Sequence, residues 1–460
     1  MKTKVVLFLI FISFQSLFSQ EIQGSWAGNL SIQGTQLPLI FNIKKNGDSY
    51  QSTLDSPMQG AKGIPIAETT FINNELQIAA PNLNLKFSGL FKGETIEGTF
   101  VQNGGSIPLV LSRKSNETPA LKRPQEPKAP FDYPIEEVVF VNAKDKNTLA
   151  GTLTLPKNKK DFPVVVIITG SGSQNRDSEI FGHKPFAVIA NDFALKGIGV
   201  LRLDDRGVGG SSKGTPEDTS ANYATDIATA VDFLSTKGFK NIGLVGHSEG
   251  GLIAPMVAVK NKNVQFVISL AGPGIPIDQM MLLQTQSIAK SQGATTTQIE
   301  ASTAFNKKVY DYIINYKGTN LQADFQPYLK DEFKKLTQDQ GLTENQIDEF
   351  VKQQTRSVAS PWYVYFLKFN PDLYWSKIKI PVLALNGSLD MQVKATENLA
   401  GIQASLAKAG NKKATIKELS GLNHLFQEAK TGSTAEYSSI EQTIAPVLLD
   451  TMSNWILGLK

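Results

Sequence analysis

Cysteine is absent from the 460-residue chain, which excludes disulfide bonds, thiolate metal sites and a lipoprotein anchor. Histidine is scarce, with three residues in all, so few imidazoles are available as a catalytic base. Beyond the first 19 residues, no apolar run approaches the roughly 20 residues that a transmembrane helix needs. The formal net charge is +4, charges of both signs are spread along the chain, and no basic block indicates a nucleic-acid partner.

The N-terminus has the features of a secretory signal over residues 1–19. Lys2 and Lys4 precede the apolar run Val5–Ile12, which is too short to span a bilayer stably. An export signal on a chain without cysteine is more typical of bacteria than of eukaryotes. We therefore expect a periplasmic or secreted protein that is cleaved near Ser19. The sequence does not indicate an oligomeric state.

Three regions of different composition follow the expected signal. Residues 20–114 alternate apolar and polar side chains in short segments separated by turns, which predicts an all-β domain, either a small barrel or a sandwich. Trp26 in this region is more typical of a core residue than of a ligand contact. Residues 115–134 hold five prolines and predict a stiff, extended linker. Residues 135–460 alternate apolar strands with helical segments, which predicts an α/β domain whose mostly parallel sheet is covered on both faces.

The most informative motif of the α/β domain is Gly246-His247-Ser248-Glu249-Gly250, a G-x-S-x-G pentapeptide. The apolar run Asn241–Val245 before it predicts a strand, and Gly251–Val259 after it predicts a helix packed on a sheet. This context is typical of a nucleophile elbow. The turn is so tight that its serine takes strained backbone angles and its flanking positions require glycine. Ser248 is therefore the predicted nucleophile.

A serine nucleophile needs a neighbouring base, usually an imidazole. His247 lies inside the elbow and cannot fold back onto the side chain of the next residue. His183 precedes the elbow, whereas the expected order along the chain is serine, acid, histidine. His424, in a glycine-containing loop near the end of the chain, is therefore the predicted base.

The acid that orients the imidazole is expected between the serine and the histidine, at the end of a strand. Asp390 meets this condition because it follows the apolar run Ile380–Leu385, which suits a strand buried on both faces of a parallel sheet. Capping of the following helix is an alternative role for this aspartate. Asp372 and Glu418 are competing carboxylates, and neither follows so clear a strand.

Backbone amides are expected to stabilise the oxyanion of an acyl-transfer reaction. One is the amide of Glu249, directly after the nucleophile; the role of the Glu249 side chain stays open. The other is expected in the glycine-rich loop 169–177, with Ser171 as the first choice and Gly172 as the second. A phosphate-binding role for this loop is not favoured, because no Lys stands in P-loop register.

A second loop, Leu203–Ser212, follows another predicted strand and contains Asp205 and Arg206. Either side chain is a candidate for substrate binding, with Arg206 the preferred one. An internal salt bridge that shapes the loop is nevertheless the favoured interpretation.

Residues 274–379 interrupt the α/β pattern just before the strand that leads to Asp390. They are rich in Gln, Lys and Ala and contain helical stretches, which predicts a cap that encloses the serine and sets substrate choice. Its aromatic residues are the candidates for lining the substrate pocket, with Trp362, Tyr365 and Trp375 the preferred ones among Trp362, Tyr363, Tyr365, Phe366, Phe369, Tyr374 and Trp375. Packing of the cap on the core is an equally good interpretation for each of them.

Together these motifs resemble the α/β-hydrolase superfamily, and within it secreted bacterial carboxylesterases of the esterase D type and the broader serine aminopeptidase (S33-like) group. The resemblance covers residues 135–460 and rests on Gly170-Ser-Gly with Arg176-Asp177, the loop Asp204–Ser211, Gly246–Gly251, Asn386–Val393 and Asn423-His424. It implies hydrolysis through an acyl-enzyme, in which Ser248 attacks the carbonyl, His424 takes and returns the proton, and Asp390 holds His424. It implies no metal and no organic cofactor.

The function predicted from the sequence is that of a carboxylesterase acting on small to medium acyl esters. A serine peptidase of the aminopeptidase or dipeptidyl peptidase type is the alternative among enzymes, in which Glu249, Asp205 or acidic residues of the cap would hold a free N-terminal amine. The alternative outside enzymes is a binding protein, either an inactive hydrolase scaffold or a carbohydrate-binding module at Glu21–Arg113. The complete triad argues against an inactive scaffold.

Overall fold

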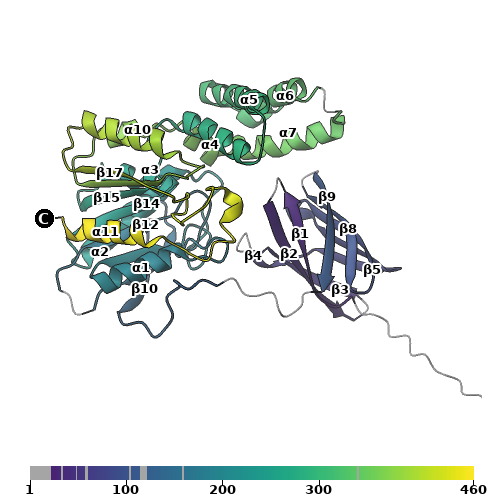
Figure 1. Ribbon diagram of the computed structural model, residues 1–460, viewed down its shortest axis with the longest axis horizontal. Helices are drawn as coiled ribbons and strands as arrows, with labels where there is room; N and C mark the ends of the chain where they lie inside the picture. The colour runs from purple at the N-terminus through teal and green to yellow at the C-terminus, as the bar shows by residue number, and fades with distance from the viewer. Residues whose placement is uncertain are drawn as a thin grey trace, which may run out of the picture.

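The structure is a computed structural model that describes residues 22–32, 35–47, 49–56, 61–102, 105–113, 122–157, 160–338 and 341–459 (Figure 1). The signal expected at residues 1–19 lies outside the described residues, as do residues 114–121 around the start of the expected linker. In the described part of the chain, no helix has the length and apolar character needed to cross a membrane.

The N-terminal region is a nine-stranded antiparallel sheet, in agreement with the predicted all-β domain. Its order is β4-β3-β2-β1-β9-β8-β7-β6-β5, so β4 and β5 stand at its two edges although they are consecutive in sequence. The strands are β1 (Gly24–Ile32), β2 (Thr35–Asn46), β3 (Ser49–Ser56), β4 (Ala61–Pro65), β5 (Glu68–Ile72), β6 (Glu75–Ala80), β7 (Leu85–Phe91), β8 (Thr95–Gln102) and β9 (Gly105–Arg113).

This N-terminal sheet curls until β5 reaches β3. The Ile66 amide donates to the Ser52 carbonyl at 3.1 Å, and the Thr69 hydroxyl donates to Ser52 Oγ at 2.9 Å. Buried and exposed residues alternate strictly along β7, as the two-residue period of a strand requires. Trp26 is fully buried in the resulting core and donates from Nε1 to the Ile22 carbonyl at 2.7 Å. The sheet therefore forms a curled, barrel-like unit around its own core, and Trp26 is a core residue.

The described part of the expected linker, residues 122–134, packs against the α/β domain instead of extending freely. The Arg123 guanidinium donates to the Phe181 carbonyl at 2.8 Å. Gln125 donates from Nε2 to the Ile444 carbonyl at 2.7 Å. These residues are therefore attached to the α/β domain well before its first strand begins.

An eight-stranded, mostly parallel sheet forms the centre of the α/β domain, in the order β10-β11-β13-β12-β14-β15-β16-β17. β10 and β11 form an antiparallel pair, β11 is antiparallel to β13, and the remaining neighbours are parallel. The strands are β10 (Ile135–Val141), β11 (Thr148–Thr154), β12 (Val164–Ile168), β13 (Gly199–Leu203), β14 (Ile242–His247), β15 (Val264–Leu270), β16 (Val382–Gly387) and β17 (Ala414–Leu419).

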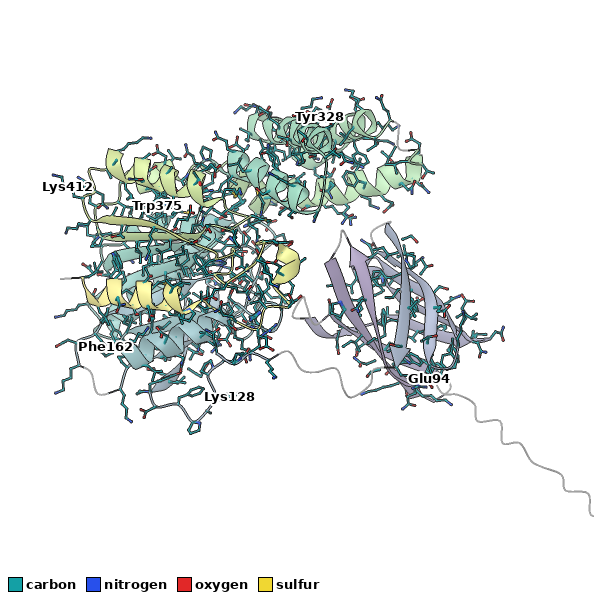
Figure 2. The ribbon with its side chains drawn as sticks, viewed as in Figure 1. Glu94, Lys128, Phe162, Tyr328, Trp375 and Lys412 are labelled. Atoms are coloured by element: carbon teal, nitrogen blue, oxygen red, sulfur yellow. The ribbon has the colours of Figure 1, made fainter. Side chains whose placement is uncertain are left out.

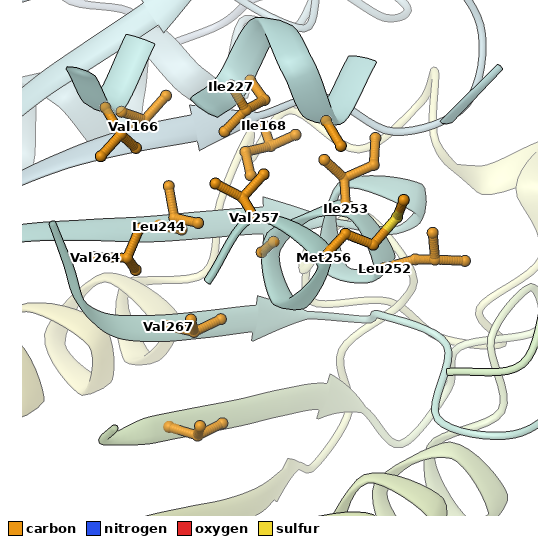
Figure 3. Close-up of a cluster of buried hydrophobic side chains, with 14 of the residues drawn as sticks. Val166, Ile168, Ile227, Leu244, Leu252, Ile253, Met256, Val257, Val264 and Val267 are labelled. Atoms are coloured by element: carbon orange, nitrogen blue, oxygen red, sulfur yellow. The ribbon is translucent and has the colours of Figure 1, made fainter. Parts of the chain in front are cut away.

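Helices cover both faces of this sheet. One face packs against α2 (Ser220–Thr236), α3 (Glu249–Ala258) and α10 (Ala395–Lys408), and the other packs against α1 (Pro185–Lys196) and α11 (Pro446–Leu457). Successive residues of β12 join opposite layers: Val166 and Ile168 belong to the first layer, and Ile167 to the second. Figure 3 shows side chains of β12, β14 and α3 meeting in the first layer. This is the predicted doubly covered sheet of an α/β-hydrolase fold.

The insertion between β15 and β16 is helical, as predicted. Its helices are α4 (Ile277–Ser291), α5 (Thr296–Asn315), α6 (Leu321–Leu336), α7 (Glu344–Val358), α8 (Pro361–Leu367) and α9 (Asp372–Trp375). Thr295 and Thr343 begin α5 and α7 with capping boxes, in which threonine and glutamine side chains satisfy the first free amides. Figure 1 shows α4 to α7 as a separate layer, and Figure 2 shows Tyr328 within it. These helices share a small core of their own around Ile313, Phe325 and Val351.

Candidate active site

Ser248 stands at the turn between β14 and α3, where the sequence predicts an elbow. Its φ of 55° and ψ of −120° lie in a strained region of backbone space. A Cβ atom at Gly246 would lie 2.0 Å from the Gly250 carbonyl oxygen, and one at Gly250 would lie 2.4 Å from the Ile168 carbonyl oxygen. Only glycine fits at either position, so the pentapeptide is required by the geometry of the turn.

His424 and Asp390 come together at the carboxyl edge of the parallel sheet. His424 Nδ1 donates to Asp390 Oδ2 at 2.7 Å, and both side chains are almost fully buried. The other carboxylate oxygen accepts the amides of Gln392 and Val393 at 2.8 and 2.9 Å. Asp390 is thus held by the loop after β16 and fixes the orientation of the His424 ring.

The competing carboxylates lie elsewhere. Asp372 accepts from the Ser405 hydroxyl at 2.6 Å and from Lys408 Nζ at 3.0 Å, on the side of α10. Glu418 is exposed on β17. Neither Asp372 nor Glu418 is thereby brought to His424, so Asp390 is the acid that the geometry favours.

The other two histidines are engaged in structural contacts. His183 is buried, with its ring nitrogens 2.9 Å from Thr443 Oγ1 and 3.2 Å from the Tyr437 carbonyl, and burial lowers its pKa to about 4. His247 donates from Nε2 to the His424 carbonyl at 2.9 Å, and burial likewise lowers its pKa to about 4. His247 therefore supports the loop that carries His424.

Ser248 and His424 line one pocket of about 710 Å³. Its wall combines the glycine-rich loop (Gly170–Gln174), helix α4 (Met280, Met281, Gln284), helix α8 (Trp362, Tyr363, Phe366), the segment 178–181 and Leu37 of β2. The sequence did not predict the contributions of α4 and of Leu37. The sequence patterns of α4 and β2 indicate which side chains are buried. They do not indicate which other part of the protein those side chains contact.

The expected oxyanion loop passes directly over the nucleophile. A Cβ atom at Gly170 would lie 3.2 Å from Ser248 Cβ, so a side chain at this position would crowd the serine. Ser171 and Gly172 line the pocket, and Gly172 has a φ of +87° that favours glycine. Glu249 is the first residue of α3, where backbone amides have no partner within the helix. The three residues that carry the candidate donors therefore line the same pocket as Ser248.

The Glu249 side chain makes buried hydrogen bonds. Its Oε1 accepts from the Ser220 hydroxyl at 2.6 Å and from Trp362 Nε1 at 3.0 Å, and the residue is 2% exposed. Glu249 thus links the helix behind the nucleophile to α2 and to the cap helix α8. This linkage is the role that the sequence left open.

The candidates for substrate binding separate into two groups. Trp362 lines the pocket with Ser248, stacked on Phe366 with ring centroids 5.3 Å apart. Tyr365 lines a different hollow on the outer side of α8. Trp375 is fully buried in the core of the α/β domain (Figure 2). The structure therefore brings one of the three preferred aromatic candidates, together with Tyr363 and Phe366, to the pocket of Ser248.

Arg206 is also not brought to the pocket. Its guanidinium forms ion pairs with Asp145, Asp218 and Asp226 at 2.6, 3.0 and 2.6 Å. Its side chain is 4% exposed, so no donor is presented to a substrate. The salt-bridge interpretation of Arg206 matches this arrangement, although Asp205 is not one of its partners.

Comparisons with known proteins agree with the fold. The model of the family described as serine aminopeptidase, S33, matches residues 183–429, more than half of the chain, including Ser248, Asp390 and His424. The esterase EstD of Thermotoga maritima is 31% identical over 160 residues, which are 34% of this chain and 39% of that protein. A probable 1-acylglycerol-3-phosphate O-acyltransferase of Oryza sativa subsp. japonica is 29% identical over 137 residues, 29% of this chain and 30% of that protein. The chain thus spans well under half the length of these curated relatives.

Two solved structures are also among the matches. An esterase of Pyrococcus furiosus is 15% identical, with a TM-score of 0.42 and coverage of 71% of this chain and 91% of that one. An α/β-hydrolase of Penicillium sp. sh18 is 18% identical, with a TM-score of 0.41 and coverage of 64% and 91%. On the match to more than half of its residues, the chain belongs to the serine aminopeptidase S33 family of α/β-hydrolases.

Proposed function

We propose that the protein is a serine hydrolase, and specifically a carboxylesterase for small to medium acyl esters. The observation that carries the proposal is the 2.7 Å contact between His424 Nδ1 and Asp390 Oδ2, in the pocket that also holds Ser248. A buried aspartate on Nδ1 fixes the tautomer in which Nε2 is free to accept a proton. The remaining steps follow from this arrangement.

In the first half-reaction, the Ser248 hydroxyl attacks the ester carbonyl while His424 Nε2 takes its proton. The tetrahedral oxyanion is stabilised by the amide of Glu249 and by an amide of the loop over Ser248, that of Ser171 or Gly172. Each such donor contributes about 3–4 kcal/mol to the transition state. His424 then gives its proton to the departing alcohol, which leaves an acyl-enzyme.

In the second half-reaction, a water attacks the acyl-enzyme while His424 again acts as the base. The tetrahedral intermediate collapses, Ser248 regains its proton and the carboxylic acid is released. Asp390 holds the His424 ring in place and stabilises the imidazolium that forms in each half-reaction. The residues of this chain supply every proton transfer in this scheme.

The pocket supports the proposed substrate class. A pocket of about 710 Å³ is within the range of sites for small organic ligands. Met280, Met281 and Phe366 give its cap side an apolar wall that suits an acyl chain. The acyl group is therefore proposed to lie against α4 and α8.

A serine peptidase remains the second candidate, because Glu179 is exposed at the same pocket and is a carboxylate that suits a free amine. Two of the acidic groups considered for that role are engaged: Glu249 accepts from Ser220 and Trp362, and Asp205 accepts from Thr169. No described Asp or Glu of the cap lines this pocket. Glu179 alone favours this reading, so esterase activity is the leading proposal.

The test is activity profiling on p-nitrophenyl esters of increasing chain length beside aminoacyl p-nitroanilides. We expect ester turnover to exceed anilide turnover, and both to disappear in Ser248→Ala. A fluorophosphonate should label the wild-type serine and not the variant. Anilide turnover that exceeds ester turnover would favour the peptidase, and no turnover or labelling of either kind would favour a binding protein.

We also propose that the chain is exported and that residues 1–19 are removed. The support is the lysine and apolar pattern of this segment. Mass spectrometry of the protein from a cell-envelope fraction should give a mature N-terminus near Gln20. An intact Met1 in a protein recovered from the cytosol would contradict export.

A further inference from the structure

One side chain holds both ends of the loop that passes over the nucleophile. The Thr169 hydroxyl donates to the Asp205 carboxylate, with 2.8 and 2.9 Å to its two oxygens. The Gln174 amide donates to Asp205 Oδ2 at 2.9 Å, and the Asp205 amide donates back to the Gln174 carbonyl at 3.0 Å. Asp205 thus closes the segment 169–174 into a ring that contains Gly170, Ser171 and Gly172.

The topology explains why an aspartate from a distant segment reaches this loop. β12 and β13 are parallel neighbours, so the segments that follow Ile168 and Leu203 leave the same edge of the sheet side by side. Two aspartates follow β13, and they serve different partners. Asp204 accepts from the Arg176 amide at 2.9 Å and from Arg176 Nη2 at 2.7 Å, further along the loop after β12, whereas Asp205 binds Thr169 and Gln174 at the two ends of the segment over Ser248.

Packing alone does not fix this loop. Ser171, Gly172 and Ser173 are exposed to the pocket on one side. A cavity of about 30 Å³ also lies among Gly170, Gly172, Asp205 and Glu249. A loop segment that borders open space depends on its hydrogen bonds for a defined geometry.

The surroundings of the Asp205 side chain disfavour a negative charge. This argues that Asp205 does more than stabilise the fold. Burial, reinforced by the charges of Glu249 and Asp226, raises the pKa of the Asp205 carboxyl to about 7, against hydrogen bonds from Gln174 and Thr169 that lower it. Tyr223 also faces this group, and Arg206 gives its guanidinium donors to other aspartates. Buried carboxylates without a cationic partner are retained most often at functional sites.

We propose that Asp205 is a positioning residue that holds the loop 169–174 in the geometry in which its amides reach the oxyanion above Ser248. This inference rests on the proposed function, because an oxyanion forms only if Ser248 attacks an acyl group. Asp205 acts through Thr169 and the backbone of Gln174 and does not itself touch the substrate. Its contribution therefore appears in the rate of acyl transfer and not in substrate binding.

The experiment measures kcat and KM for p-nitrophenyl acetate in full-length variants, with thermal unfolding of each to correct for the folded fraction. Asp205→Ala should lower kcat by about 100-fold at pH 8, comparable to the loss of one oxyanion donor, with KM changed by less than about threefold. Asp205→Asn keeps the shape and one acceptor oxygen, so it should restore part of this loss. Thr169→Val should lower kcat by about tenfold, and Thr169→Ser, which keeps the hydroxyl, should recover the wild-type value.

Asp218→Asn is the matched control. Asp218 is as buried as its neighbours and pairs with Arg206, but it makes no contact with the loop. This variant should lower the unfolding temperature and leave kcat per folded molecule unchanged. An equal loss of kcat in Asp218→Asn would overturn the inference, because the effect would then follow from general damage to the charge cluster.

A pH profile separates positioning from simple support of the fold. Asparagine resembles a protonated aspartate, so the ratio of wild-type to Asp205→Asn kcat should fall toward one as the pH drops through about 7. The requirement for neutral His424 cancels in this ratio because both proteins share it. A ratio that stays constant with pH, or an Asp205→Ala kcat within threefold of wild type, would overturn the inference while leaving the esterase proposal intact. Absence of Ser248-dependent turnover in the wild type would remove both.

Discussion

The two sheets of this protein bury different kinds of polar side chain. Among the described residues, the buried polar side chains of the N-terminal sheet are hydroxyls, those of Ser52, Ser56 and Thr69. The α/β domain instead buries carboxylates, guanidinium groups and imidazoles, among them Asp390 and His424. A hydroxyl is inexpensive to bury once it is hydrogen-bonded, whereas a charge is costly. The candidate catalytic groups Asp390 and His424 belong to this buried set, whereas other members, such as Arg206 with its three aspartates, form ion pairs that support the fold.

The nucleophile gives the strongest test of this comparison. Ser248→Ala should abolish ester hydrolysis and leave the fold intact, because the half-buried hydroxyl faces the pocket and not the core. His424→Ala should have nearly the same effect, and the double variant should lose little more, since triad members act as a unit. Turnover and circular dichroism check both points. Substantial hydrolysis in either single variant would show that the buried ionisable groups serve another purpose.

Replacement of the buried acid should have the next largest effect. Asp390→Asn keeps two amide contacts to its oxygen but favours the wrong tautomer of His424, which should lower kcat by about 10⁴-fold. Asp372→Asn and Glu418→Gln serve as controls, and each should stay within about threefold of wild type. If either control is the more damaging change, the acid has been assigned wrongly.

The sequence predicted the parts of this site that depend on local constraint. The elbow was recognisable because Gly246 and Gly250 have no space for a side chain, and His424 was identified because few histidines compete with it. The strands and helices of the α/β domain also followed their predicted pattern. These features are fixed by residues that are close in sequence or few in number.

The features that the sequence did not predict depend on tertiary contacts. Trp362, Tyr365 and Trp375 look alike in sequence, but they face the pocket, an outer hollow and the core, respectively. Asp205 accepts hydrogen bonds from the Thr169 hydroxyl and from the backbone amide of Gln174, 31 residues earlier in the chain. No sequence pattern marks either donor. Such roles become visible only when the register of β12 and β13 is known.

The hydrogen bond from Trp362 to Glu249 allows a test of how the cap affects the pocket of the α/β domain. Trp362→Phe keeps the ring stack on Phe366 but removes the Nε1 donor to Glu249, so the cap side of the pocket should loosen. We expect the ratio of hexanoate to acetate ester turnover to change by about three- to tenfold, with a smaller change in acetate turnover alone. Tyr365→Phe is the matched control, because this side chain lies outside the catalytic pocket. An equal shift in the control would contradict a specific role for Trp362.

The smallest effect is expected where the N-terminal sheet meets the pocket. Leu37 supplies an apolar contact and no ionisable group, so Leu37→Ala should leave acetate ester turnover unchanged. It should lower turnover of longer esters by less than about threefold, or less than about 0.7 kcal/mol, because the half-buried Leu37 contributes only a small part of the ~1.5–3 kcal/mol of a fully buried leucine. Steady-state kinetics across the ester series checks this expectation.

Removal of the whole N-terminal sheet extends the same argument. A chain beginning at Lys122 keeps the contacts of Arg123 and Gln125 with the α/β domain, whereas a chain beginning at Phe131 loses them. Both chains should hydrolyse acetate esters with a kcat close to that of the full protein, because the triad and its charges lie beyond residue 135. The shorter chain should unfold at a lower temperature, since the hydrogen bonds of two half-buried side chains are gone. A folded, soluble chain beginning at Lys122 without esterase activity would mean that the N-terminal sheet completes the catalytic site, and the division of roles between the two sheets would then be wrong.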